Sequence, residues 1–474
     1  MTAPALHWFR RDLRLADNPA LATAARRSAG AVHPVFVIDP TLTQSRRVGA
    51  NRLAFLYARL RTLDAELRSI GSALIVLQGD PRIVLPAYVA AHGIGTVTWQ
   101  ADPAPWGAAR DAVVAALLTA TGVAVDTSDS QILVPVAAIR SGTGSPYTVF
   151  TPYAKRWRQL LAVPAAIDTP FLAPVVTAPD ELAVPAVTCD IPLPDTRESY
   201  ARDLLQRFVV RRIAQYDSGR DQMAQAGTSM LSPYIRFGIL SIQACARVAL
   251  SADGPGAAVW LSELAWRDFY THIAAHFPHI RAGNYRRQYD ALQWENDPRL
   301  FDAWCRGQTG YPVVDAAMRQ LTSTGWMHNR ARMIVASFLT KDLLIDWRWG
   351  ERFFMQHLLD GDTPANNGGW QWAASTGTDA QPYFRIFNPS SQGQRFDPDG
   401  AYVKRFVPEL ARVPAQYIHT PWLLTPMLQH AYGVRLGVDY PHPIVDHAAQ
   451  RPKVMAMFAA ARTDAAGESD GKNG

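Results

Sequence analysis

The chain is poor in cysteine and lysine, and it has no long apolar run. Its three cysteines, Cys189, Cys245 and Cys305, lie far apart without a CxxC pair, which argues against a disulfide framework or a zinc site and fits a reducing compartment. No apolar run approaches the roughly 20 residues that a membrane helix needs. The first residues carry no secretory signal pattern. These absences predict a cytoplasmic protein with no metal site.

The first turn lacks the GxGxxG pattern of dinucleotide-binding sheets and reads FRRDLRLADN instead. Around it, short apolar runs alternate with helical stretches, which predicts a doubly wound parallel sheet. The expected strands are Ala5–Phe9, Val32–Asp39, Ala73–Gln78, Thr96–Gln100 and Val123–Asp126. The expected helices begin at Asn18-Pro19, cover Asn51–Ile70, follow Asp80-Pro81 and cover Pro105–Thr121. Without a pyrophosphate cradle in this sheet, the main cofactor is expected to bind elsewhere.

The length of 474 residues, with 48% hydrophobic and 19% charged residues, predicts an ordinary globular protein of two domains. We expect an α/β domain over residues 1–130, a connector over 131–199, an all-helical domain over 200–462 and a disordered tail over 463–474. The net charge of +6 comes largely from arginine. This charge favours either an anionic partner or a mildly basic enzyme without one.

Hydroxyl groups gather before a predicted helix in the segment YDSGRDQMAQAGTSMLSPYIRFG, which begins at Tyr216. The hydroxyls of Thr228, Ser229 and Ser232 could hold phosphate or ribityl oxygens. On this segment alone, a plain helix N-cap is the more common explanation.

The predicted helix WLSELAWRDFY places Glu263, Trp266 and Arg267 on one face, at positions i, i+3 and i+4. A carboxyl, an indole and a guanidinium in this arrangement suit a heterocycle beside a phosphate. An exposed salt bridge next to a core tryptophan explains the same spacing.

Two later segments, WMHNRARM and DGDTPANNGGWQW, combine carboxylates with arginine, asparagine and tryptophan. In the first, Asn329 and Met333 share a helical face, and Arg332 is placed to meet Asp360 of the second. In the second, Trp370 and Trp372 would lie about 200° apart on a helix, so one indole could serve a flat redox cofactor and the other a second ligand. Taken singly, each tryptophan is more often a core residue than a functional one.

Together these segments resemble the photolyase/cryptochrome family, and within it the class I cyclobutane pyrimidine dimer photolyases. The resemblance runs from WFRRDLRLADN to YPHPIVDH, and its most specific motifs lie in Ala258–Pro389. It implies an N-terminal antenna domain and an all-helical domain that holds FAD. It also implies a reaction in which photoexcited reduced FAD gives an electron to a flipped-out dimer in DNA, the cyclobutane ring splits and the electron returns.

The resemblance assigns roles to individual residues. The FAD set is Tyr216, Thr228, Ser229, Met230, Leu231, Ser232, Arg332, Asp360, Gly361, Asp362 and Asn366, with Asn366 facing N5 and counted as catalytic. The electron relay is Trp294, Trp347 and Trp370. The lesion and DNA set is Arg220, Glu263, Trp266, Arg267, Tyr270, Asn329, Arg330, Met333, Trp372 and Ser391, with Glu263 also catalytic as the hydrogen-bond partner of the pyrimidine.

Two features separate branches of the family. Asn329 and Met333 stand where (6-4) photolyases carry histidine, which favours cyclobutane dimers as the substrate. Residue 366 is Asn rather than the Asp or Cys common in signalling cryptochromes. Both features favour a repair enzyme. A cryptochrome-like blue-light photoreceptor without repair activity is the alternative hypothesis, and a flavin electron-transfer protein unconnected with light is the third.

The antenna chromophore is predicted from two positions at which this chain differs from folate-binding relatives. Folate-binding relatives carry a Glu at the position of Gly107 and a Lys near Arg281, and this chain has neither. We expect 8-hydroxy-5-deazaflavin, with Asp39, Arg52 and Asp102 as candidate contacts. Methenyltetrahydrofolate is the second candidate and an empty pocket the third. The expected partner is DNA containing pyrimidine dimers, with association to the nucleoid through DNA, no membrane and a monomeric state.

Overall fold

The computed structural model describes residues 3–174 and 184–470, and the chain divides into two compact units. Unit 1 comprises Met1–Asp217, Ser229–Pro278 and Leu359–Pro364. Unit 2 comprises Ser218–Thr228, His279–Leu358 and Ala365–Gly474. The units are therefore interleaved along the chain. The regions expected from the sequence follow one another along the chain, with boundaries after residues 130 and 199, and they stay a prediction.

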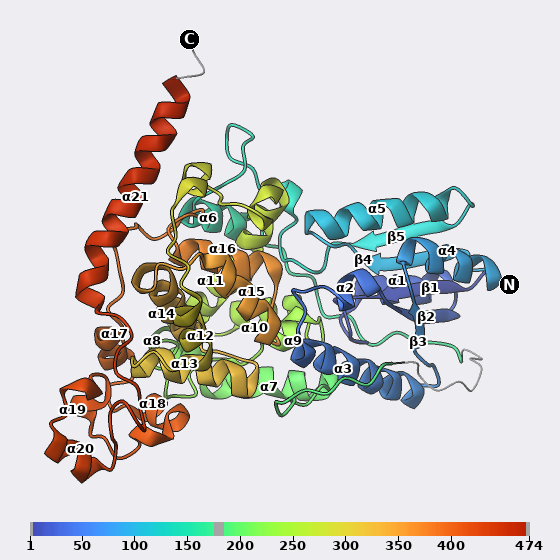
Figure 1. Cartoon of the computed structure of the whole chain (residues 1–474). Helices are drawn as coiled ribbons and strands as arrows, with labels where there is room; N and C mark the ends of the chain where they lie inside the picture. The colour runs from blue at the N-terminus through green and yellow to red at the C-terminus, as the bar shows by residue number, and fades with distance from the viewer. Residues whose placement is uncertain (1–2, 175–183, 471–474) are drawn as a thin grey trace. The chain divides into compact units, whose positions relative to one another are not determined.

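A five-stranded parallel sheet forms in the described N-terminal residues of unit 1 (Figure 1). Its strands are β1 (Ala5–Phe9), β2 (Val32–Ile38), β3 (Ile75–Gln78), β4 (Thr96–Gln100) and β5 (Ala124–Ser128), in the order β3-β2-β1-β4-β5. Residue His7 of β1 is paired with Pro34 on one side and Thr98 on the other. The parallel pairing and the reversal of order at β1 confirm the predicted doubly wound α/β class.

Helices return the chain between the strands, and they are α1 (Pro19–Arg27), α2 (Pro40–Thr43), α3 (Ala50–Ser69), α4 (Pro81–Ala91) and α5 (Pro105–Thr119). Helix α1 begins as predicted, because Asn18 caps it by accepting from the Leu21 N–H and Pro19 follows at once. Leu85 of α4 and Val114 of α5 pack on the same face of the sheet as Trp8. The short helix α2 was not predicted.

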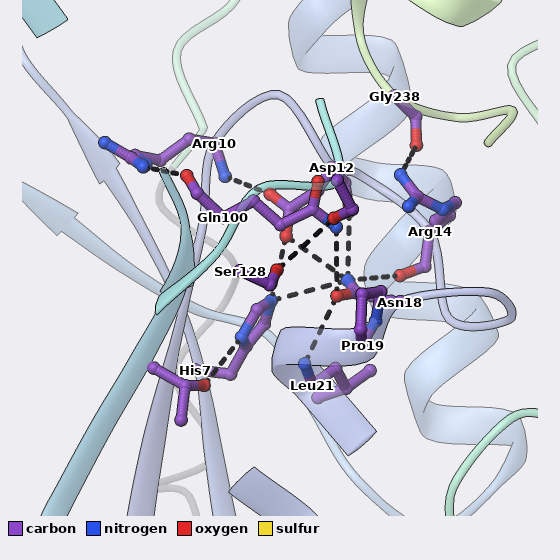
Figure 2. Close-up of polar contacts among 12 residues, drawn as sticks. His7, Arg10, Asp12, Arg14, Asn18, Pro19, Leu21, Gln100, Ser128 and Gly238 are labelled. Carbon is purple, nitrogen blue, oxygen red and sulfur yellow. Dashed lines mark hydrogen bonds and ion pairs between the residues drawn. The ribbon is translucent and has the colours of Figure 1, made fainter. Parts of the chain in front are cut away.

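A buried polar network fills the carboxyl ends of β1 and β4, where doubly wound sheets commonly bind ligands (Figure 2). Asp12 accepts from His7 Nε2 at 3.1 Å and from Asn18 Nδ2 at 3.2 Å, while Gln100 Nε2 donates to Asn18 Oδ1 at 3.2 Å. Burial alone would raise the pKa of Asp12, but the hydrogen bond from His7 holds it below its usual value. Side chains thus occupy the place where the missing glycine-rich turn would have held a phosphate.

The expected connector contains packed structure, namely η1 (Val136–Ala138) and α6 (Phe150–Leu160). Trp157 of α6 is fully buried and donates through Nε1 to Asp268 of α11 (Pro255–His276) at 3.0 Å. Asp268 also accepts from the Leu133 N–H at 2.8 Å. These bonds make the first half of the connector part of unit 1. Residues 161–174 and 184–197 contain no helix or strand.

The described residues after Arg197 form helices and loops, with one isolated bridge between Leu436 and Tyr440, and this confirms the helical C-terminal part. Besides α11, its helices up to residue 291 are α7 (Glu198–Arg211), η2 (Ile213–Gln215), α8 (Tyr216–Gly219), α9 (Ser232–Arg236), α10 (Ile242–Ser251), η3 (Pro278–Arg281) and η4 (Arg287–Ala291). The next are α12 (Pro298–Arg306), α13 (Pro312–Thr324), α14 (Asn329–Ser337), the π-helix η5 (Phe338–Asp342), α15 (Trp347–His357) and α16 (Thr363–Ala373). The last are α17 (Pro389–Phe396), α18 (Ala401–Phe406), η6 (Pro408–Leu410), α19 (Ala415–Ile418), η7 (Pro421–Leu423), α20 (Pro426–Tyr432) and α21 (His447–Asp470).

Helix α21 reaches Asp470, so residues 463–470 of the expected disordered tail lie in its last turns. Residues 471–474 lie outside the described part of the chain. A core cluster of unit 2 contains the indoles of Trp304, Trp347 and Trp370.

Candidate functional site

In unit 1, the turn before α9 and the first residue of that helix carry four residues of the predicted FAD set. Ser229 Oγ accepts from the Leu231 N–H at 3.4 Å, and Met230 has a φ of 56°, which is uncommon for a residue other than glycine. The N-cap position of α9 is Leu231, which makes no side-chain capping hydrogen bond. The hydroxyls of Ser229 and Ser232 therefore do not serve as the N-cap that a plain structural explanation required.

The segment Leu359–Pro364 also belongs to unit 1 and carries Asp360, Gly361 and Asp362 of the FAD set. Gly361 O accepts from Arg236 Nε at 2.9 Å and from Arg52 Nη1 at 3.2 Å. Asp362 accepts from Arg11 Nη2 at 2.7 Å. Three arginines from distant parts of the sequence thus contact two consecutive residues of the segment.

Helix α11 presents the predicted lesion residues of unit 1. Glu263, Trp266 and Tyr270 are partly exposed, and the rings of Trp266 and Tyr270 lie 5.5 Å apart. Arg267 is different, because its Nη1 donates to the Gln131 carbonyl at 2.7 Å and its side chain is largely buried. Arg267 therefore anchors the connector to α11, and its predicted contact with DNA stays untested.

In unit 2, α14 places Asn329 in an exposed position and Met333 in a partly buried one. Arg330 donates to Asp221 at 2.9 Å and lies over the Phe396 ring, while Arg332 Nε donates to the Met327 carbonyl at 2.9 Å.

Two further residues of the DNA set lie near the surface of unit 2. Arg220 is partly buried, and Ser391 is exposed, with its N–H bound to the Asn388 side chain at 3.1 Å.

The three tryptophans of the predicted relay all lie in unit 2, on one core. Trp370 and Trp347 are buried within the core, and Trp294 packs against it from a partly exposed position. Trp347 Nε1 donates to the buried Asn284 Oδ1 at 2.8 Å. The indole of Trp370 lies against Gly350, where an added Cβ would come within 2.1 Å of Trp370 Cη2.

A second set of rings extends from Trp370. The centroids of Trp304 and Trp370 are 6.1 Å apart, those of Phe301 and Trp304 are 5.8 Å apart, and those of Phe301 and Trp349 are 5.1 Å apart. Trp349 is partly exposed.

The other residues of the Asp360–Trp372 segment have distinct surroundings. Asn366 Nδ2 donates to the Glu351 carbonyl at 3.0 Å, which fixes the orientation of the amide. Trp372 is partly exposed whereas Trp370 is buried, in keeping with indoles that point in different directions on one helix.

The three antenna candidates make structural hydrogen bonds in unit 1. Asp39 caps α2 by accepting from the Thr41 N–H at 2.8 Å, and Asp102 accepts from the Ala104 N–H at 3.0 Å. Arg52 is buried and donates to Gly361 O, as described above. A Cβ at Gly107 would come within 2.1 Å of the Asp102 carboxylate, so the Glu of folate-binding relatives does not fit beside Asp102 as it lies.

The predicted sets are divided between the units. Unit 1 holds Tyr216, Ser229, Met230, Leu231, Ser232, Glu263, Trp266, Arg267, Tyr270, Asp360, Gly361 and Asp362. Unit 2 holds Arg220, Thr228, Trp294, Asn329, Arg330, Arg332, Met333, Trp347, Asn366, Trp370, Trp372 and Ser391. The expected pairing of Arg332 with Asp360 joins residues of different units and stays a prediction.

Sequence reasoning missed Arg11, Arg236, Asn284 and Phe150. Phe150 stacks on Trp266, and Asn284 binds the Trp347 indole. Arg11 lies in the run FRRDLRLADN, and no role was assigned to it from the sequence. The other three had no local signal, because each acts on a residue more than 60 positions away.

Among the described residues, no group of three His, Cys, Asp or Glu side chains is arranged to hold a metal ion. No helix in the described ranges is long and apolar enough to cross a membrane.

Comparisons with known proteins cover both parts of the chain. Residues 5–174 match the family model described as DNA photolyase, and residues 260–460 match the FAD binding domain of DNA photolyase. The chain is 43% identical to a deoxyribodipyrimidine photo-lyase of Synechococcus over 97% of both chains. Among solved structures it is similar to a class III photolyase of Agrobacterium tumefaciens (37% identity, TM-score 0.89, 98% of both chains) and to a cryptochrome of Synechocystis (30% identity, TM-score 0.87, 96% of this chain and 99% of the other).

Proposed function

The chain belongs to the DNA photolyase family, and on this premise we propose that it repairs cyclobutane pyrimidine dimers in DNA by light-driven electron transfer. The observation that carries this proposal is the row of partly exposed Glu263, Trp266 and Tyr270 on α11, whose other residues are mostly buried. Partly exposed aromatic rings beside a carboxyl suit a flat, hydrogen-bonding pyrimidine pair.

FAD is the cofactor indicated by the matching FAD-binding domain. The residues of the FAD set fit it chemically, because Thr228, Ser229 and Ser232 offer hydroxyls, and Asp360 and Asp362 offer carboxylates to a polar ring edge. When bound and reduced, FAD supplies a single electron on excitation by light. In this proposal Trp370, Trp347 and Trp294 carry charge between the core and the surface of unit 2.

Glu263 is proposed to donate or accept a hydrogen bond at the pyrimidine, while Trp266 and Trp372 enclose the dimer by stacking. Asn329 and Met333 supply no acid, which suits ring splitting rather than the proton transfer that a (6-4) lesion needs. The dimer must leave the duplex to reach these residues, and unstacking costs least at a distorted, poorly paired site.

The test is repair of an oligonucleotide with one cyclobutane dimer under blue light and in darkness. The proposal expects restoration only in light, loss of most turnover in Glu263→Gln, and no repair of a (6-4) oligonucleotide. Full repair in darkness, or a purified protein that binds no flavin, would contradict it.

A cryptochrome-like photoreceptor is the alternative, favoured by the similarity to the Synechocystis cryptochrome. It predicts light-driven reduction of the flavin with no turnover of dimers, so the same assay separates the two functions.

We propose 8-hydroxy-5-deazaflavin as the antenna chromophore, with methenyltetrahydrofolate second. The crowding of Asp102 against Gly107 supports this order, because it disfavours the folate-type Glu. Mass spectrometry of chromophores released from the purified protein tests it, and folate alone would reverse the order.

We further propose that the protein acts as a monomer in the cytoplasm on nucleoid DNA. Its arginine-rich charge should make DNA binding weaken steeply with salt, because contacts to phosphates release counterions. Sedimentation and a salt titration of binding test these two points.

A further inference from the structure

The segment Leu359–Pro364 is covalently flanked on both sides by residues of unit 2, yet it belongs to unit 1. Arginines of unit 1 contact it. Arg11 follows β1, Arg52 lies in α3 and Arg236 ends α9, so three separate elements of unit 1 reach the same two residues. We call Arg11, Arg52 and Arg236 the arginine clamp.

The clamp is held in place on its own side. Arg236 lies close to Arg11 because the two loops approach closely: Leu13 N–H donates to the Phe237 carbonyl at 3.2 Å. Gly238, with a φ of 64°, makes this approach possible, since an added Cβ would come within 1.9 Å of the Arg11 carbonyl. Arg52 is only 4% exposed, and it also donates to the Arg47 carbonyl. Guanidinium groups fixed in this way can impose a geometry on the segment that they contact.

The charges in the clamp are strongly coupled. Burial alone would raise the pKa of Asp362, but Arg11, Arg236 and Arg267 hold it below its usual value. Burial and the neighbouring Arg11 lower the pKa of Arg236 to about 9, an effect that Asp362 and Asp102 partly offset. Asp362 is therefore ionised and bound at neutral pH.

We propose that Arg11, Arg52 and Arg236 are positioning residues that hold Asp360, Gly361 and Asp362 in the geometry needed to bind the flavin. The proposal rests on the assignment of these three residues to FAD. It gives the N-terminal sheet domain a role in the flavin site itself, separate from any antenna chromophore. It also reassigns Arg52 from antenna contact to a member of the clamp.

The positive charge of the clamp has a second consequence. A guanidinium near the flavin favours a reduced, anionic flavin over the neutral oxidised one.

Arg236→Gln removes both the charge and the geometry, whereas Arg236→Lys keeps the charge but loses the planar donor group. Arg82→Gln is the matched control, since Arg82 is an exposed arginine of the same domain paired only locally with Asp80.

The experiment measures FAD dissociation constants, the visible flavin spectrum and the flavin midpoint potential in the purified full chain. Arg236→Gln and Arg11→Gln should weaken FAD binding roughly tenfold and make the midpoint potential more negative. Arg236→Lys should recover the potential but not the affinity, and Arg82→Gln should match the unchanged protein. Wild-type affinity, spectrum and potential in Arg236→Gln and Arg11→Gln would overturn the clamp.

Two controls distinguish failure of the arginine clamp from failure of the assignment of Asp360, Gly361 and Asp362 to FAD. If Asp362→Asn weakens FAD binding while the clamp variants do not, the assignment stands and the clamp falls. If Asp362→Asn binds FAD normally, the assignment falls. Hydrogen exchange at the amides of residues 359–363 then tests the clamp without reference to flavin: faster exchange in Arg236→Gln supports it, and unchanged exchange overturns it.

Discussion

Phe150 lies parallel to Trp266, with ring centroids 3.6 Å apart and planes within 7° of each other. Phe150 begins α6, in the connector, and Trp266 lies in the middle of α11. One face of the indole is therefore covered by protein, and only the other can stack on a ligand. The connector thus contributes to the proposed lesion site by fixing the orientation of the ring.

The first prediction concerns this stack. Phe150→Ala should weaken binding of dimer-containing DNA by about 0.5–1.5 kcal/mol, because Trp266 loses the ring that orients it. Phe150→Tyr keeps the stack and should restore the affinity. Fluorescence anisotropy with damaged and undamaged duplexes provides the measurement. Equal affinities for Phe150→Ala and the unchanged protein would argue that Trp266 is oriented by other contacts.

The second prediction compares two indoles of one core. Trp347 and Trp304 are 1% and 0% exposed, and both indoles are buried in the same core cluster. Replacing either by Phe should therefore lower the free energy of unfolding by a similar amount. If the relay runs through Trp347, Trp347→Phe should slow photoreduction by roughly an order of magnitude or more, and Trp304→Phe should change it little. Flash photolysis measures both. The reverse ranking would move the relay to the rings of Trp304, Phe301 and Trp349.

The third prediction concerns Asn284, which accepts from the Trp347 indole and donates to the Tyr289 carbonyl at 2.8 Å. Asn284→Leu should lower the free energy of unfolding by about 1–3 kcal/mol, because buried polar groups lose their partners. It should also slow photoreduction, since the acceptor stabilises an indole that has lost an electron. Asn284→Asp keeps the acceptor and should retain the photoreduction rate. Urea unfolding and flash photolysis, taken together, would reveal a purely structural role if only stability changed.

The fourth prediction concerns a buried lysine. Lys341 is fully buried in unit 2, where its Nζ donates to Ser375 Oγ at 3.0 Å and lies over the Phe458 ring. Burial lowers the pKa of Lys341 to about 7, from 10.5, so the unfolded chain binds the extra proton between these pH values. Stability should therefore rise as pH increases from about 7 towards 10.5.

Lys341→Met should raise the free energy of unfolding at pH 7 by about 1–4 kcal/mol and remove part of this rise. The matched control is Lys453→Met, because Lys453 is 52% exposed and pairs only with Glu295. Denaturant unfolding at pH 6, 7.5 and 9 provides the comparison. A loss of stability in Lys341→Met at all three values would mean that its hydrogen bonds outweigh the cost of burying its charge.

The sheet could be predicted from local patterns. Short apolar runs marked the strands, and caps such as Asn18 and Asp80 marked the starts of helices, because these signals act within a few residues. The residue sets assigned by resemblance could be listed, but not their surroundings. Arg52 shows why: the resemblance suggested an antenna contact, and its hydrogen bond to Gly361, 309 positions away, could not be predicted from the sequence. Contacts between residues so far apart form only in the folded chain, and they produce no periodic pattern in the sequence.

The same reason applies to the expected connector over residues 131–199. Phe150 and Trp157 lie within it, and they pack on α11 through contacts that span more than 100 residues.

Gly350 carries no reactive group, yet it decides where the Trp370 ring can lie. An alanine there would add one methyl group and force the indole, or α15 beneath it, to shift. In the proposed relay, the distance over which an electron tunnels to or from Trp370 would then change without any redox-active side chain being altered. Random mutagenesis for light sensitivity should consequently recover substitutions at this glycine alongside those at the tryptophans themselves.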